Sequence, residues 1–171
     1  MRNQSAILAI VLMIANVASA SDEALIKERL DRVRAVHGGT GPWAVVGYRM
    51  GERALKELNV PRQSFSLSVV HRCPLEVQYS CMADGLQAAT GVSSGKLNLK
   101  IEKATVDQLG TTVEDRKTGR RVSFKIKPEL AKSIANLPYD RLEAEGRRVA
   151  GLPDDAVFEL VSEAPEKEKK S

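Results

Sequence analysis

Hydrophobic positions recur along the chain with two different periods. Between residues 22 and 36 apolar side chains return every three or four positions, which predicts a helix with one buried face. A second helical pattern runs from Pro42 to about Leu58 and is apolar on more than one side, so we expect this helix to be central. Gly38-Gly39 and Pro42 separate the two, because glycine ends helices and proline is well placed in a first turn.

The middle of the chain changes to a period of two. Phe65, Leu67 and Val69 alternate with serines, which predicts a half-buried strand over residues 65–70. Related patterns predict further strands over 97–102, 105–114, 120–126 and 157–161, and short helices over 81–89, 128–135 and 139–150. The glycine-containing connection 115–119 suits a hairpin. The fold class is therefore α+β, with N-terminal helices packed on a mostly antiparallel sheet and a short helix after the first strand.

Residues 1–20 have the pattern of a secretory signal. Arg2 precedes an apolar run, and Ala18-Ser19-Ala20 supplies a small-x-small cleavage site. The run is roughly twelve residues, shorter than the about 20 that span a bilayer. We therefore expect a periplasmic or secreted protein with no membrane span after signal removal; an uncleaved anchor is the alternative. Residues 21–163 would form the domain, and residues 164–171, rich in Glu and Lys, a disordered charged tail.

Composition narrows the possible functions. The 171-residue chain has two Cys and two His, which excludes a four-thiolate zinc site or a three-histidine metal centre within one chain. Its net charge is +4, and its basic turn at residues 116–121 is not a groove-spanning stripe, so nucleic acid is not an expected partner. The glycine-rich stretch 38–41 lacks a Gly-Lys-Ser/Thr ending, so a phosphate-binding loop is not indicated.

Cys81 is the most informative candidate residue. If Ser80 caps the helix that follows, Cys81 lies in its first turn, where the free amides and the dipole lower a thiol pKa. Asp84 follows one turn later on the same face. A thiolate there would be a metal ligand or a nucleophile. Two alternatives are a Cys73–Cys81 disulfide, which an oxidising compartment permits, and an inert buried thiol.

The two histidines are weaker candidates. His37 lies at a glycine-rich corner between two predicted helices, where a neutral imidazole can bind a metal. The alternative is a histidine favoured by a helix carboxyl end. His71 and Cys73 share one face of a strand and could chelate an ion, whereas a polar strand end is as good an explanation.

Two motifs resemble the family of the E component of formylmethanofuran dehydrogenase over about residues 25–128. The segment 37–42 followed by Gly47-Tyr48-Arg49 resembles the family's His-Gly-His-x-Cys-Pro-Gly and Gly-Tyr-Arg motif. The segment 80–99 resembles the second motif, with matches at Ser80, Cys81, Asp84, Gly85, Gln87, Thr90, Gly91, Gly95, Lys96, Asn98 and Leu99. The family's second histidine and its cysteine in the first motif fall on Gly39 and Gly41, and a later family cysteine falls on Val92.

The resemblance implies an α+β fold, a possible homodimer and an association with zinc. By position it carries over His37, Cys81 and Asp84. Because the dehydrogenase acts on a cytosolic coenzyme and this chain has an export pattern, the resemblance marks a domain and not the reaction. The leading hypothesis is a non-catalytic exported protein that binds a zinc-like ion through His37 and Cys81, helped by Asp84, His71 or Cys73.

Two other hypotheses remain open. The chain could be an enzyme, or part of one, in one-carbon or cofactor chemistry, with Cys81 as nucleophile and Asp84 or His37 as proton carrier. It could also be a dimeric interaction module whose site has decayed.

Overall fold

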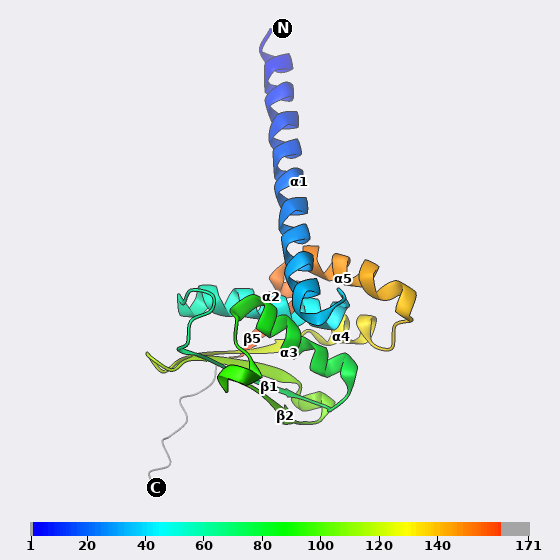
Figure 1. Cartoon of the computed structure of the whole chain (residues 1–171). Coiled ribbons are helices and arrows are strands. Elements are labelled where there is room, and N and C mark those ends of the chain that lie inside the picture. The colour runs from blue at the N-terminus through cyan, green and yellow to red at the C-terminus, as the bar shows by residue number, and fades with distance from the viewer. Residues whose placement is uncertain (1, 162–171) are drawn as a thin grey trace.

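A five-stranded sheet lies beneath a layer of helices (Figure 1). The computed structural model describes the backbone of residues 2–161 and the side chains of residues 20–161. The helices are α1 (Arg2–His37), α2 (Pro42–Leu58), α3 (Val77–Thr90), α4 (Pro128–Ile134), α5 (Leu142–Gly151) and α6 (Asp154–Val157), with 3₁₀ turns η1 (Ser94–Lys96), η2 (Val106–Gln108) and η3 (Tyr139–Arg141). The strands are β1 (Leu67–Cys73), β2 (Leu99–Lys103), β3 (Gly110–Asp115), β4 (Arg120–Ile126) and β5 (Phe158–Val161). The predicted α+β class is confirmed.

The sheet order is β2-β1-β3-β4-β5. Of the four pairings between the described strands, β1 with β2 is parallel and the other three are antiparallel. Helix α3 connects β1 to β2, as a parallel pair requires a crossover. Alternate residues of β1 are buried, namely Leu67, Val69, His71 and Cys73. Their burial puts this face of β1 against the helices.

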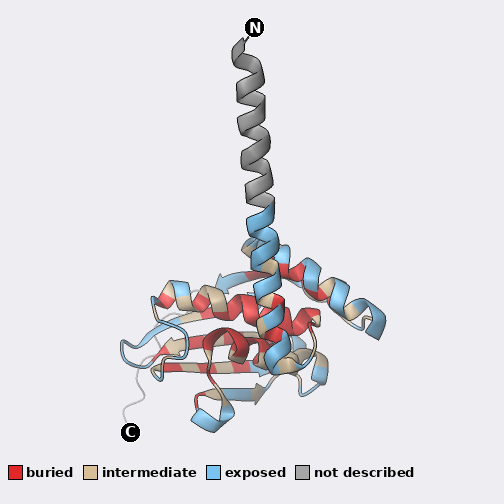
Figure 2. Ribbon diagram, turned by 45° about the horizontal axis from the view of Figure 1, so that its top comes forward, coloured by how far each residue is buried: buried red, intermediate tan, exposed pale blue. Residues whose placement is uncertain are grey.

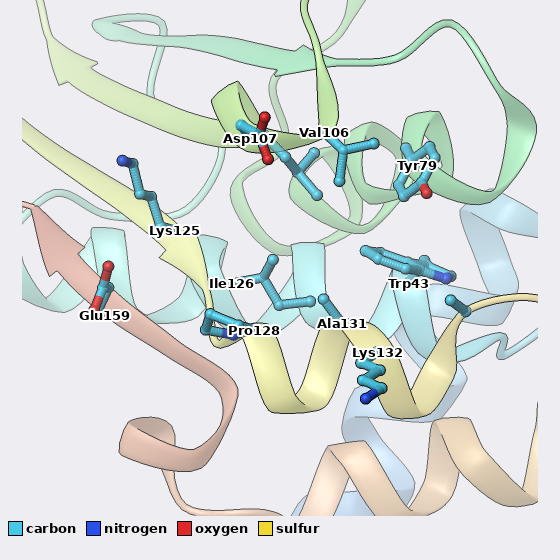
Figure 3. A pocket seen from close by; sticks show the side chains of 12 residues that line it. Trp43, Tyr79, Val106, Asp107, Lys125, Ile126, Pro128, Ala131, Lys132 and Glu159 are labelled. Carbon is cyan, nitrogen blue, oxygen red and sulfur yellow. The ribbon is translucent and has the colours of Figure 1, made fainter.

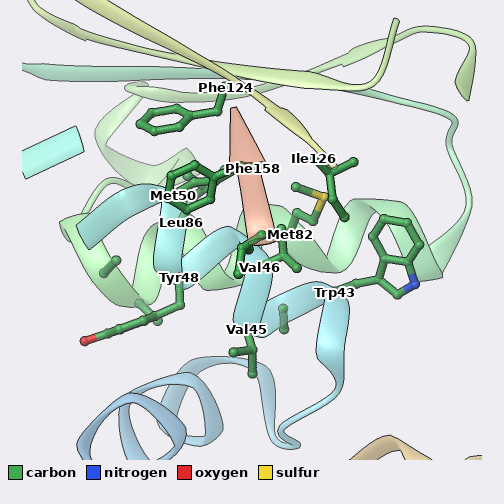
Figure 4. Close-up of a cluster of buried hydrophobic side chains, with 14 of the residues drawn as sticks. Trp43, Val45, Val46, Tyr48, Met50, Met82, Leu86, Phe124, Ile126 and Phe158 are labelled. Atoms are coloured by element: carbon green, nitrogen blue, oxygen red, sulfur yellow. The ribbon is translucent and has the colours of Figure 1, made fainter. Parts of the chain in front are cut away.

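Helix α2 is the central element, as its apolar pattern predicts, and most of its residues are buried (Figure 2). Its side chains meet those of α3 and β4 in one core, where Met50, Met82 and Phe124 are almost fully enclosed (Figure 4). Glycines let α2 and α3 touch through their backbones. A Cβ at Gly47 would lie 2.0 Å from the Met82 carbonyl oxygen, and one at Gly85 would lie 1.8 Å from that of Ala44.

Arg49, in the Gly-Tyr-Arg motif, joins α2 to the carboxyl end of α5. It is 3% exposed, and its guanidinium donates to the Val149 and Ala150 carbonyls at 2.9 and 3.2 Å and to the Asp154 carboxylate at 2.6 Å. Arg53 donates to the other oxygen of Asp154 at 3.1 Å. Burial lowers the pKa of Arg49, and the Asp154 carboxylate opposes that change without reversing it. The role of this motif arginine is thus to hold α5 and α6 on α2.

Three strand predictions are wrong at their amino ends. Phe65 is 74% exposed and precedes β1, because residues 61–64 form a turn in which the Ser64 amide bonds to the Pro61 carbonyl. Leu97 is 90% exposed and has a left-handed φ of 54°, so β2 begins two residues later. The predicted strand 105–114 begins instead with η2, whose capping box joins Thr105 and Gln108.

The first helix is longer than predicted. Its backbone is helical from Arg2, through the predicted cleavage site, to His37. Leu30 and Val33 are buried, and Arg29 donates to Glu52 of α2 at 2.9 Å. Among the described residues, no helix is long and apolar enough to cross a membrane. The side chains of residues 1–19 of the predicted signal, and the predicted tail 164–171, lie outside the described residues.

Candidate functional site

His37 and Asp84 form the polar centre of the candidate site. The Nδ1 atom of His37, the last residue of α1, lies 2.8 Å from Oδ2 of Asp84 on α3. The His37 side chain is 23% exposed and that of Asp84 47%. With Asp84 accepting the Nδ1 proton, the neutral ring has its lone pair on Nε2. The glycine corner after His37 is packed closely against α5, since a Cβ at Gly146 would lie 1.6 Å from the Thr40 carbonyl oxygen.

Cys81 does not begin its helix, and the prediction that Ser80 caps that helix is wrong. Helix α3 starts at Val77, with Glu76 in the N-cap position. The Ser80 hydroxyl donates to the Val77 carbonyl at 3.4 Å, so it bonds inside the helix. Cys81 therefore lies in the second turn, beyond the free amides that would stabilise a thiolate.

The environment of Cys81 favours the thiol. Burial raises its pKa, and the neighbouring Asp84 carboxylate raises it further, while a backbone hydrogen bond opposes the change. The predicted lowering of the Cys81 pKa is therefore wrong, because the helix begins one turn earlier than the sequence predicted. A thiol of this kind is a poor nucleophile until a cation displaces its proton.

His37 and Cys81 line the same pocket, although they come from different helices. The pocket has a volume of about 380 Å³ and is otherwise mostly apolar. Gln78 and Asn136 supply its uncharged polar side chains, and Trp43 forms part of its wall. We call this cavity the His37–Cys81 pocket. Trp43 is not among the residues predicted for the site, and its position just after Pro42 at the start of α2 was the available signal.

His71 and Cys73 do not line the His37–Cys81 pocket. His71 is fully buried, with Nδ1 3.0 Å from the Thr111 hydroxyl and Nε2 3.2 Å from the Tyr79 carbonyl oxygen. Nε2 must therefore carry the proton, and Nδ1 accepts from Thr111. Burial lowers the pKa of this ring, so it is kept neutral. The structure thus makes His71 a core histidine.

Both cysteines are free thiols, so the disulfide alternative is wrong for this structure. Cys73 is fully buried in the core, and burial raises its pKa. Among the described residues, no group of three or more His, Cys, Asp or Glu is arranged to hold a metal ion. The structure therefore brings together three of the predicted site residues, His37, Cys81 and Asp84. Two of them, His37 and Cys81, are suitable metal donors and line one pocket.

The basic hairpin has structural partners. Arg120 donates to the Glu57 and Leu58 carbonyls at the end of α2, at 2.6 and 3.2 Å. Arg116 donates to the Phe65 carbonyl at 2.7 Å. These arginines hold the turn on the domain.

Comparison with known proteins gives a family and a fold. The family model described as "FmdE, Molybdenum formylmethanofuran dehydrogenase operon" matches residues 36–168, more than half of the chain. The chain is also similar to the crystal structure of a protein from Syntrophus aciditrophicus that is described as like FmdE of a tungsten formylmethanofuran dehydrogenase. Identity is 21% and the TM-score 0.54, over 85% of this chain and 79% of that one, which supports the fold alone. No curated protein matches the sequence.

Proposed function

Because the chain belongs to the FmdE family, we propose that it is an exported protein that binds a zinc-like ion in the His37–Cys81 pocket, and that it is not itself a dehydrogenase. The observation that supports this most is that an imidazole and a thiol from α1 and α3 line one cavity. Nitrogen and sulfur donors suit zinc and similar borderline ions better than magnesium or calcium.

Asp84 would orient the imidazole. Its bond to Nδ1 of His37 leaves Nε2 as the nitrogen that faces an ion. Metal-binding histidines commonly give their second nitrogen to a carboxylate in this way, which fixes the ring and makes it more basic. We therefore assign Asp84 to holding His37, and assign no metal role to His71 or Cys73.

The proposed site has two protein donors, one fewer than most catalytic zinc sites. Water or a small molecule in the pocket would complete the coordination. An ion bound in this way would act as a Lewis acid toward that molecule or would be transferred to another protein. Open coordination positions allow the ion to exchange more readily than a closed structural site does.

The reactive-thiol alternative has less support. Because burial and Asp84 raise the pKa of Cys81, the free protein holds a thiol near neutral pH. A nucleophile would need that pKa lowered. A metal ion does not have this requirement, since it binds by displacing the proton.

Export and assembly are further parts of the proposal. The pattern of residues 1–20 supports cleavage before Ser21. Intact-mass measurement on exported protein tests this, and a soluble cytosolic product that retains residues 1–20 would contradict it. We also expect a homodimer on the family resemblance, which light scattering of the purified protein tests directly.

Zinc titration by calorimetry tests the binding proposal. We expect Asp84→Asn to lower affinity roughly 10- to 100-fold, and the loss of either donor, in Cys81→Ser or His37→Ala, to lower it more. Cys73→Ala is the matched control, because it removes the other thiol from the core without touching the pocket. Equal zinc affinity in the wild type, Cys81→Ser and His37→Ala would refute the proposed function.

A further inference from the structure

A second, larger pocket lies between η2, the end of β4 and α4 (Figure 3). Its volume is about 550 Å³, within the range of roughly 300–1,000 Å³ for small-molecule sites. Trp43 lines both this pocket and the His37–Cys81 pocket, while His37, Cys81 and Asp84 do not line the larger one. We call it the Trp43–Ala131 pocket; its occupancy does not depend on a metal.

The interior of this pocket is apolar. Trp43 and Tyr79 pack edge to face, with ring centroids 5.0 Å apart and an interplanar angle of 74°. Trp43 Nε1 already donates to the Ile134 carbonyl at 3.1 Å, so the indole offers no free donor. Ile126 and Ala131 face the same space (Figure 3). The body of a ligand must therefore be hydrophobic, and an aromatic ring suits a wall made of aromatic rings.

Four charged residues surround this interior. They are Lys125, Lys132, Asp107 and Glu159. Glu159 pairs with Lys127 at 3.7 Å, whereas within residues 20–161 neither Lys125 nor Lys132 has an acidic partner, and Asp107 has no basic one. The two lysine side chains extend from opposite sides of the pocket, one from β4 and one from α4 (Figure 3). The unpaired charge at the rim is therefore net positive.

We infer that the Trp43–Ala131 pocket binds a small hydrophobic carboxylate, with its aromatic or similarly apolar body against Trp43 and its carboxylate at the lysine rim. A largely apolar interior and a positively charged rim complement a molecule that is apolar at one end and anionic at the other. A neutral molecule would use the interior alone. A cation would meet two unpaired ammonium groups and one unpaired carboxylate, that of Asp107, so the net effect of the rim on it is repulsive.

Trp43 is the single tryptophan of the chain and lines both pockets, so its fluorescence reports on binding in either, and the Ala131→Phe variant below assigns the signal to this pocket. Phenylacetate, 2-phenylethanol and 2-phenylethylamine share one ring and differ in charge. Each is titrated with a chelator present and in Cys81→Ser, so that a metal in the neighbouring pocket contributes nothing. We expect saturable fluorescence change with phenylacetate, weaker binding of the alcohol and the weakest of the amine. Equal binding of all three, or no saturable change with phenylacetate, would overturn the inference.

Variants of the lysines and of Ala131 test where the ligand binds in the pocket. The double variant Lys125→Gln/Lys132→Gln should weaken phenylacetate binding by a factor on the order of two to five, as expected for exposed ion pairs, and leave 2-phenylethanol unchanged. Lys103→Gln on β2 is the matched control and should change neither. Ala131→Phe should fill the pocket and abolish binding, with a circular dichroism spectrum that shows the fold retained. Phenylacetate affinity that is unchanged in the double lysine variant would contradict the assigned carboxylate position.

Discussion

At the scale of single residues, the two histidines have opposite surroundings. His37 borders a pocket, whereas His71 is enclosed, with both ring nitrogens hydrogen-bonded. Burial lowers the pKa of His71 below its ordinary 6.5, so below that pH the unfolded chain takes up a proton that the folded chain refuses. The free energy of unfolding should therefore fall as the pH drops below about 6.5.

Urea unfolding at several pH values between 7.5 and 5 measures this effect. The wild type and His37→Ala should lose stability over that interval, and His71→Gln should lose less, although it starts lower at pH 7.5 because the buried ring is gone. Since the chain contains two histidines, each variant serves as the control for the other. A wild-type decline that His71→Gln reproduces in full would show that other groups cause it.

Asp84 acts on Cys81 as well as on His37. Its carboxylate raises the pKa of the thiol, second to burial. Asp84→Asn should therefore lower that pKa and speed alkylation of Cys81 by iodoacetamide near neutral pH, in the absence of metal. Peptide mass mapping separates Cys81 from Cys73, which is buried and supplies the internal control. Slower alkylation of Cys81 in Asp84→Asn would contradict this electrostatic account.

At the scale of secondary-structure elements, the α2–α3 contact depends on glycine. A Cβ at Gly47 would overlap the Met82 backbone, which cannot move aside without shifting α3. Gly47→Ala should therefore lower the free energy of unfolding by about 1–3 kcal/mol or more. Gly39→Ala is the matched control, because a Cβ there meets nothing within 4 Å, and its effect should be small. Chemical denaturation measures both, and equal stability of the two variants would contradict close helix packing.

The sequence predicted whole elements better than their ends. Helix α2 has the predicted bounds because Pro42 and the left-handed Asn59 mark its ends in the sequence. Phe65 continues the alternation of β1, but a turn leaves it outside the strand with Lys96 5.0 Å above its ring. The alternation of hydrophobic residues alone does not predict that turn. The parallel β1–β2 pair likewise depends on where α3 returns the chain, which local patterns do not encode.

Part of the candidate site could also be predicted from the sequence. The motif positions led to His37, Cys81 and Asp84, which the structure brings together. The predicted direction of the Cys81 pKa shift was wrong. It depends on where the helix starts, and α3 starts at Val77, four residues before the predicted start at Cys81. The role of Trp43 required the packing of α2 against α3 and α4, which a single sequence does not reveal.

At the scale of the whole molecule, we expect the domain to pack without the predicted signal. Within residues 20–161, α1 contacts the core through Ile26, Leu30 and Val33, and Glu23 is paired with Arg147. A chain that begins at Ser21 should therefore unfold at the same temperature as the full chain, within about 2 °C, since a 1 kcal/mol change shifts the midpoint by roughly 2–4 °C in a chain of this size. Calorimetric scans of both forms provide the comparison, and a much lower midpoint for the shorter chain would contradict this boundary.

The cobalt absorption spectrum tests most directly whether Cys81 and His37 hold one ion. Co²⁺ replaces zinc in such sites, and a coordinated thiolate gives it a charge-transfer band in the near ultraviolet. The band should form in the wild type and in Cys73→Ala, vanish in Cys81→Ser, and weaken and shift in His37→Ala. A wild-type protein without the band, or a band of equal strength in Cys81→Ser, would contradict the shared site.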